Sequence, residues 1–129
     1  MHAVFVYGSL KKGFYNHAFL RGAHFAGPVV SCDAYCLFSL GSYPGLHKRP
    51  AQYPVVGELY QVDAGGLQRL DELEENGHEY QREIIQVQTP LGQSLPAWCY
   101  FYLGPRPRGL LGRGTDINAD GCISWSRRR

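Results

Sequence analysis

A glycine-containing turn near the start of the chain is the first candidate for a binding site. An apolar run over residues 4–6 leads directly into Tyr7, Gly8, Ser9 and Leu10. Glycine lets the backbone turn sharply, and successive N–H groups after a strand form a concave site that suits a carboxylate. The alternative is an ordinary turn from strand to loop. Ser9 is not predicted to be a nucleophile, because it has neither a Gly-x-Ser-x-Gly context nor a matching His–Asp pair.

The second candidate is the carboxyl of Glu74, near the end of a helix predicted over residues 63–76. At 100° per residue this carboxyl falls within the apolar stripe, where lost solvation raises its pKa. The charges of Asp71, Glu72 and Glu75 and the negative end of the helix dipole act in the same direction. A carboxyl tuned in this way suits general acid–base catalysis. The helix itself is indicated by three leucines, an N-cap and a stop signal: Leu67, Leu70, Leu73, Asp63, Asn76 and Gly77.

Two other interpretations of Glu74 are open at the level of sequence. The carboxyl could form an ion pair with an arginine, for which Arg82 is the candidate partner. Alternatively, the helix could end early and leave the carboxyl in water.

The elements that would position these residues are short strands joined by turns, as the frequent glycines and prolines indicate. A hairpin turn is predicted at residues 89–93 and a short second helix at 16–20. The run 98–102 is apolar on both faces, which places it centrally in a sheet or barrel wall. Several strands with one well-defined helix predict an α+β domain with a curled sheet or small barrel. The predicted strands cover residues 3–7, 29–40, 55–62, 80–88 and 95–103.

The length and composition indicate one folded domain. A chain of 129 residues fits a single domain, and 44% apolar with 19% charged residues excludes wholesale disorder. We expect the domain to cover residues 1–103. Residues 104–129 are rich in turn formers and are expected to form an irregular tail, packed on the domain or extending from it.

The charge pattern narrows the possible partners. The formal net charge is +2, and the basic excess lies in the tail, including residues 127–129. No basic stripe runs along the rest of the chain, so no nucleic-acid partner is predicted. Lys11 and Lys12 are expected to be solvated, and one of them could steer an acidic ligand. With no run near the ~18 apolar residues that cross a bilayer and no signal-peptide pattern, a cytoplasmic protein without a membrane partner is expected.

The cysteines do not indicate a metal site. Cys32 and Cys36 would lie on one face of a strand about 13 Å apart, which is too far for a disulfide. The chain has no CxxC or HxxxH pair, so no metal is predicted. All four thiols, which include Cys99 and Cys122, are expected to be buried small apolar groups.

Together these residues resemble the γ-glutamylcyclotransferase-like family, which includes the γ-glutamylamine cyclotransferases and the AIG2-like proteins. The resemblance implies a small mixed β-barrel with flanking helices. Members often close with a Gly-Asp-Trp-like element, whereas here no Asp separates Gly121 from Trp125. The matching segments lie in family order within residues 4–102: VYGSLKKG at 6–13, YPGL at 43–46, VGELY at 56–60, LDELE at 70–74 with Tyr80 and Arg82 after it, and AWCY at 97–100.

The resemblance also implies an activity and a role for each motif. The turn over residues 7–10 would hold the α-carboxylate and α-amino end of a small γ-glutamyl substrate, and Glu74 would be the catalytic acid–base. The substrate's own α-amine would attack its γ-amide carbonyl, which releases 5-oxoproline and a free amine without metal or cofactor. Further residues expected around the pocket are Tyr43, Tyr80, Arg82 and Tyr100.

Two other functions compete with the enzyme. The first is a non-catalytic module of the same fold that binds a small ligand or another protein. Such a module would gain nothing from a neutral carboxyl at Glu74. The second is a nucleic-acid adaptor that uses the arginine-rich tail, and its binding would depend strongly on salt.

Overall fold

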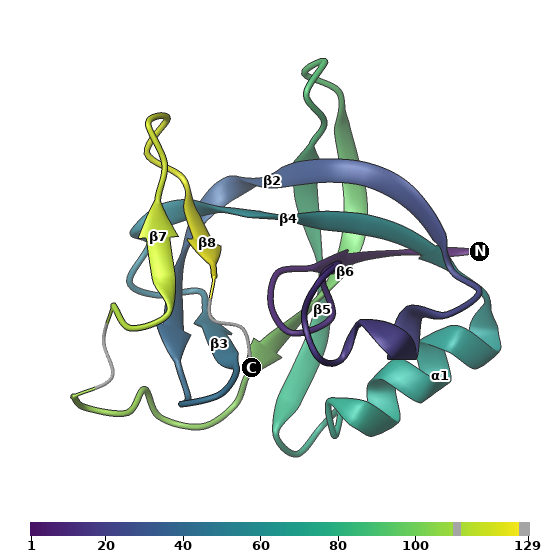
Figure 1. The fold of residues 1–129 in the computed structure, drawn as a ribbon, viewed down its shortest axis with the longest axis horizontal. Coiled ribbons are helices and arrows are strands. Elements are labelled where there is room, and N and C mark those ends of the chain that lie inside the picture. Colours follow the sequence, from purple (N-terminus) through teal and green to yellow (C-terminus); the bar gives the residue numbers. More distant parts are fainter. Residues whose placement is uncertain (110–111, 127–129) are drawn as a thin grey trace.

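The computed structural model describes residues 1–109 and 112–126. Residues 127–129, which are part of the arginine-rich tail that the nucleic-acid hypothesis invokes, lie outside the described residues. Figure 1 shows the arrangement of the elements. In chain order they are β1 (His2–Val6), the 3-10 helix η1 (His17–Leu20), β2 (His24–Ser39), β3 (Pro44–His47), β4 (Tyr53–Val62), α1 (Ala64–Leu73), β5 (Tyr80–Gln88), β6 (Ser94–Tyr102), β7 (Thr115–Ile117) and β8 (Ile123–Trp125).

Five of the strands close into a barrel. Their order is β2-β5-β6-β1-β4, and the ring closes because β2 also pairs with β4. β1 runs antiparallel to β4, from His2 opposite Val62 to Val6 opposite Glu58, and parallel to β6 at Val4 opposite Trp98. Both the predicted α+β class and the predicted central position of β6 are confirmed.

A bulge in β2 lets one long strand serve two parts of the fold. The pairing of β2 with β4 shifts register between Val30 and Ala34. The buried Ser31 hydroxyl lies at this shift, where it accepts a hydrogen bond from the Val55 N–H at 2.8 Å and donates one to the Asp33 carbonyl at 2.7 Å. Bulges bend a strand, so the first half of β2 closes the barrel while its second half pairs with β3.

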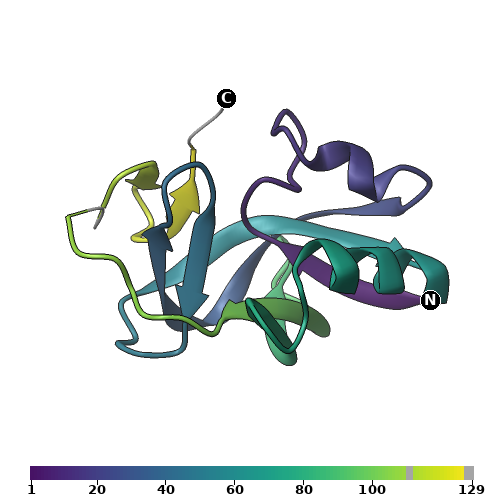
Figure 2. The same cartoon turned by 90° about the horizontal axis from the view of Figure 1, so that it is seen from below.

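Two hydrophobic clusters fill the molecule, and β1 contributes to both. Alternate side chains of a strand point to opposite faces. Phe5 therefore belongs to the cluster on the barrel side, whereas Val4 packs in the cluster that contains Leu67 and Leu70 of α1. Figure 2 shows α1 crossing the outer face of β1, and this packing fixes the end of the helix relative to the end of β1.

The chain after β6 differs from the irregular tail that the sequence predicts. β7 and β8 pair as a hairpin, and β8 also runs parallel to β4 at Val55 opposite Ile123. Trp125 at the end of β8 is only 1% exposed. Strands of three residues are too short to show an alternating pattern, which explains why the sequence does not predict them.

The cysteines are free thiols, but they are not all buried. Cys36 and Cys99 are buried, whereas Cys122 is half-buried and Cys32 is exposed. The prediction is wrong for Cys32 because this residue lies within the bulge of β2, where the strand alternation breaks. None of the helices in the described part of the chain is both long and apolar enough to span a membrane.

Candidate active site

The turn after β1 is shaped by a close contact at Gly8. A Cβ atom on Gly8 would lie 2.6 Å from Cγ of Pro44, closer than real side-chain atoms approach one another. Glycine is therefore required here so that residues 43–44 can lie against the turn. Tyr7, directly before it, is buried, and its hydroxyl donates a hydrogen bond to the Tyr100 carbonyl at 2.5 Å. Both contacts place the turn against strands that are distant in sequence.

The loop that follows folds back on Ser9. The Asn16 side-chain amide donates to the Ser9 hydroxyl at 3.0 Å, and the Asn16 N–H donates to the Ser9 carbonyl at 2.9 Å. The Lys11 N–H closes the turn on the Gly8 carbonyl at 3.1 Å. The bonds from Asn16 to Ser9 and from Lys11 to Gly8 therefore hold the backbone of the turn on both sides of Leu10.

Helix α1 ends earlier than the sequence predicts, at Leu73, and Glu74 is its C-cap. Asp63 is the N-cap as predicted, with its carboxylate accepting from the Gly66 N–H at 2.7 Å. The early end arises at Glu75, whose φ of 49° is left-handed and reverses the chain before residue 76. Glu74 nevertheless stays half-buried, so the interpretation that an early end leaves it in water is wrong.

The Glu74 carboxyl has a perturbed pKa. Burial, first, and the negative charge of Glu79, second, raise the pKa of Glu74 from 4.5 to about 7. The sequence predicts this direction, but it assigns the repulsion to Asp71, Glu72 and Glu75. The repelling charge comes instead from Glu79, which the chain brings back toward the pocket after the turn at residues 75–78.

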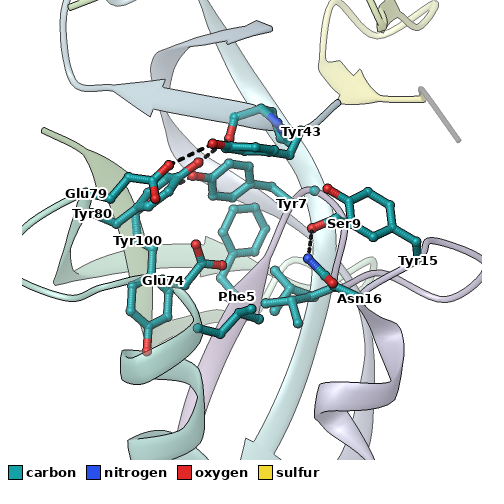
Figure 3. A pocket seen from close by; sticks show the side chains of 15 residues that line it. Phe5, Tyr7, Ser9, Tyr15, Asn16, Tyr43, Glu74, Glu79, Tyr80 and Tyr100 are labelled. Carbon is teal, nitrogen blue, oxygen red and sulfur yellow. Dashed lines mark hydrogen bonds between the residues drawn. The ribbon is translucent and has the colours of Figure 1, made fainter. Parts of the chain in front are cut away.

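A pocket of about 210 Å³ lies between the turn, the end of α1 and the start of β3. Figure 3 shows the Glu74 carboxyl pointing into it, with Ser9 and Asn16 on the opposite side. The described lining contains two carboxyls and no lysine, arginine or histidine. The residues around it are Phe5, Val6, Tyr7, Gly8, Ser9, Leu10, Tyr15, Asn16, Tyr43, Pro44, Leu73, Glu74, Glu79, Tyr80 and Tyr100.

Two tyrosines fix the wall beside Glu74. The Tyr43 hydroxyl donates to Oε1 of Glu79 at 2.8 Å, and the Tyr80 hydroxyl donates to the Pro44 carbonyl at 2.7 Å. Burial and the hydrogen bond to Glu79 raise the pKa of Tyr43 to about 12. Burial also raises the pKa of Tyr80, with a smaller contribution from Glu74. Both phenols are therefore neutral near pH 7, which leaves Glu74 as the group with a pKa suited to proton transfer there.

Arg82 lies behind the pocket rather than in its lining. Its Nε donates to Oδ1 of Asp71 at 2.9 Å, and its guanidinium carbon lies 4.1 Å from the centre of a Trp98 ring. The same Asp71 oxygen accepts a hydrogen bond from the Tyr100 hydroxyl at 2.7 Å. Because the side chain of Arg82 turns to Asp71, its prediction as a pocket residue is wrong, and so is its pairing with Glu74.

Several lining residues are not predicted from the sequence. Tyr15 and Asn16 come from an irregular loop, and Glu79 comes from the turn before β5. None of them lies in a periodic pattern that reveals which way its side chain points. The one available signal is sequence proximity, since Glu79 directly precedes Tyr80 in a segment already singled out.

The fold and the site define a class of protein: a small closed-barrel domain in which a strand-end turn faces a half-buried carboxyl at a helix end. The family model described as gamma-glutamyl cyclotransferase, AIG2-like, matches residues 4–119. The chain belongs to this family, so the predicted membership of an enzyme family is confirmed.

Relatives agree over most of the chain. The gamma-glutamylcyclotransferase family protein YtfP of Escherichia coli K12 is 42% identical over 102 residues, which cover 79% of this chain and 83% of that protein. The crystal structure of an AIG2-like protein from Mus musculus superposes with a TM-score of 0.78 at 28% identity, covering 100% of this chain and 98% of that one. An uncharacterized protein from Pyrococcus horikoshii gives a TM-score of 0.64 at 30% identity, with 86% and 85% covered.

Proposed function

We propose that this protein cleaves a small γ-glutamyl amine or γ-glutamyl peptide to 5-oxoproline and a free amine, with Glu74 as general acid and base. The observation that carries this proposal is the Glu74 carboxyl, which points into the pocket with a pKa of about 7. Family membership supports the reaction type. The assignment of Glu74 and of the substrate-binding turn is the proposal.

The pocket suits the two charges of a glutamyl end. The substrate's α-ammonium is attracted by the carboxyls of Glu74 and Glu79. Its α-carboxylate finds no basic side chain in the described lining, so backbone N–H groups of the turn at residues 8–10 are the donors that we assign to it. A volume of about 210 Å³ favours a small substrate, because pockets for drug-sized ligands are roughly 300–1,000 Å³.

The reaction has to move two protons off the α-nitrogen of the substrate. The Glu74 carboxylate takes a proton from the α-ammonium, and the freed amine attacks the γ-carbonyl of the same molecule to form a five-membered ring. As the bond from carbon to the leaving nitrogen breaks, the protonated Glu74 gives its proton to that nitrogen, which departs as the neutral amine. The Glu74 carboxylate then takes the second proton from the ring nitrogen, which becomes the single N–H of 5-oxoproline, and passes it to the released amine or to water. A group with a pKa near 7 can perform both transfers near neutral pH.

Positioning is the second contribution of the site. The nucleophile and the electrophile belong to one molecule, so the protein has to fold the substrate into its attack geometry. Correct orientation can be worth on the order of 7–11 kcal/mol in model reactions. The turn is held by the contact with Pro44 and by the bonds between Ser9 and Asn16, so it is built to fix one end of the substrate.

The test measures the release of 5-oxoproline and free amine from a panel of γ-glutamyl compounds: γ-glutamyl-lysine, γ-glutamyl dipeptides and glutathione. We expect turnover of at least one compound by the wild type and a loss of about 10²–10⁴-fold in Glu74→Gln. Glu72→Gln is the matched control, because Glu72 is exposed on the same helix end. Thermal stabilisation by a compound that neither protein turns over would contradict the enzyme and indicate a binding module.

A further inference from the structure

Lys11, which the sequence predicts to be solvated, is buried at the base of the turn. The residue is only 8% exposed. Nζ donates a hydrogen bond to the Trp125 carbonyl at 2.7 Å and lies 4.7 Å from the ring centre of Phe14. Lys12 is exposed, and its Nζ lies over the ring of Phe25 on the surface. The two adjacent lysines therefore have different environments, and Lys11 joins the turn to the far end of the chain.

The acceptor belongs to a firmly packed element. Trp125 ends β8, which is held between β7 and β4 by the pairs Thr115–Trp125 and Val55–Ile123. The Trp125 indole N–H is buried without an acceptor among the described residues. Burying an unbonded donor is unfavourable, so the ring is held there by apolar packing in the barrel cluster. The C-terminal hairpin is thus a fixed support for whatever bonds to it.

The turn is supported from two other sides, and Lys11 adds the third. Pro44 of β3 lies against Gly8, and Oε1 of Glu58 in β4 accepts a hydrogen bond from the Lys12 N–H at 2.9 Å. Lys11 connects the same turn to Trp125 across 114 sequence positions. Its own N–H closes the turn on the Gly8 carbonyl, so Lys11 holds the end of the segment that presents Ser9 and Leu10 to the pocket.

We propose that Lys11 is a positioning residue, which holds the pocket-forming turn at residues 8–10 in place by bonding the C-terminal hairpin at the Trp125 carbonyl. The effect on substrate binding rests on the proposed function, while the effect on the turn does not. Lys11 is not among the residues that line the described pocket. Its removal should therefore loosen the turn that holds the substrate and leave the Glu74 carboxyl in place.

The experiment compares wild type with Lys11→Met, Lys11→Arg and Lys12→Met. Methionine keeps an unbranched apolar stem but cannot donate to the Trp125 carbonyl, whereas arginine restores a charged donor. The first readout is hydrogen–deuterium exchange of the amides of residues 8–12, which requires no substrate. In Lys11→Met we expect exchange there to rise about tenfold, with exchange in β1 and β6 unchanged. Lys11→Arg and Lys12→Met should exchange like the wild type.

The second readout is steady-state kinetics on the best substrate of the γ-glutamyl panel. Lys11→Met should raise KM about tenfold with kcat within about threefold, and Lys11→Arg should restore most of the loss. If Lys11→Met does not fold, Lys11→Leu takes its place, because its apolar side chain cannot donate to the Trp125 carbonyl either.

The outcomes separate this inference from the proposed function. Unchanged exchange at residues 8–12 in Lys11→Met, or an equal increase in Lys12→Met, would overturn the role of Lys11. A loss confined to kcat would overturn it as well, since positioning of the turn acts on substrate binding. A third outcome is faster exchange in Lys11→Met together with no turnover of any γ-glutamyl compound by the wild type. This result would uphold the role of Lys11 and contradict the proposed function.

Discussion

The carboxyls of Glu74 and Glu79 line the same pocket, and the charge of Glu79 adds to burial in raising the pKa of Glu74. Five sequence positions separate the two residues, and the turn that follows α1 brings the second one to the pocket wall. Glu79 is itself held by the hydroxyl of Tyr43, a residue of the segment before β3. The pKa of the proposed catalytic carboxyl therefore depends on contacts from three parts of the chain.

Glu79→Gln should shift the pH dependence of the reaction to lower pH. The proposed base is the ionised form of Glu74, so kcat/KM should rise with pH through a midpoint near 7 in the wild type. Removing the nearby negative charge lowers the pKa of Glu74, and the rising limb then moves to lower pH. Glutamine keeps an oxygen that can accept the hydrogen bond from Tyr43. The measurement is kcat/KM from pH 5 to 9.

The control for this shift is Glu72→Gln, which removes an exposed carboxyl from the same helix end. It should leave the midpoint of the pH profile where the wild type has it. An NMR titration of the Glu74 side chain gives the same comparison without a substrate. Equal midpoints in wild type and Glu79→Gln, by both methods, would show that the charge of Glu79 does not raise the pKa of Glu74.

The raised pKa of Glu74 should also appear in the stability of the protein. The folded state binds the Glu74 proton more tightly than the unfolded chain, with a pKa of about 7 against 4.5. The contribution to stability is therefore fully present below pH 4.5 and is lost as pH rises through 7. The loss amounts to on the order of 3 kcal/mol, at 1.36 kcal/mol for each pKa unit.

Glu74→Gln should remove this pH dependence. Glutamine has no proton to release, so the variant should equal or exceed the wild type in free energy of unfolding at pH 9. At pH 5, where the wild-type carboxyl is protonated in the folded state, the two should be similar. Urea denaturation at both pH values measures the difference. A wild type that gains stability relative to the variant between pH 5 and 9 would contradict a buried neutral carboxyl.

The features that the sequence predicts correctly are those that depend on a local pattern of residues. β5 agrees with its predicted bounds at residues 80–88, and Asp63 caps α1 as expected. Helical periodicity places Glu74 on the apolar stripe, and this holds even though the helix ends one residue before it. Patterns of this kind depend on side chains only a few positions apart, which is the range over which a strand or helix repeats.

Most of what the sequence does not predict depends on contacts between distant segments. The place of the β7–β8 hairpin against β4 and the buried position of Lys11 both depend on segments far away in the chain. Arg82 is misassigned for the same reason. Its partner Asp71 is one of several acids at the helix end, and only the packing of α1 on the barrel selects it. Close approaches such as that of Gly8 to Pro44 likewise appear only in three dimensions. β3 pairs with the end of β2, but its four residues are too few to show an alternating pattern.

Asp71→Ala should destabilise the protein, because it removes the one oxygen that accepts hydrogen bonds from two different side chains. The Tyr100 hydroxyl and Nε of Arg82 both donate to Oδ1 of Asp71, in a partly buried setting. Leaving such donors without an acceptor costs about 1–3 kcal/mol each. We expect a loss at the lower end of that range, because each side chain is near water. Urea denaturation measures the loss.

The comparison for this variant is Glu83→Ala, which breaks the exposed ion pair with Lys48. Exposed pairs contribute about 0–1 kcal/mol, so this loss should be clearly the smaller of the two. Equal losses in the two variants would mean that Asp71 acts as an ordinary surface carboxylate. In that case the hydrogen bonds from Tyr100 and Arg82 to Asp71 would not stabilise the pocket wall more than a surface ion pair does.

Gly8→Ala should disturb both stability and substrate binding, because the new methyl group would lie 2.6 Å from Cγ and 2.8 Å from Cδ of Pro44. The ring of Pro44 is rigid, so the turn or β3 has to move, at a cost of about 1–3 kcal/mol. Gly65→Ala is the opposite case, since its Cβ would meet nothing closer than 3.6 Å in the first turn of α1. There alanine should stabilise the protein by about 0.5–1 kcal/mol. Denaturation curves of both variants, with KM for Gly8→Ala, test this pair, and a Gly8→Ala protein as stable and active as the wild type would show that the turn tolerates a side chain.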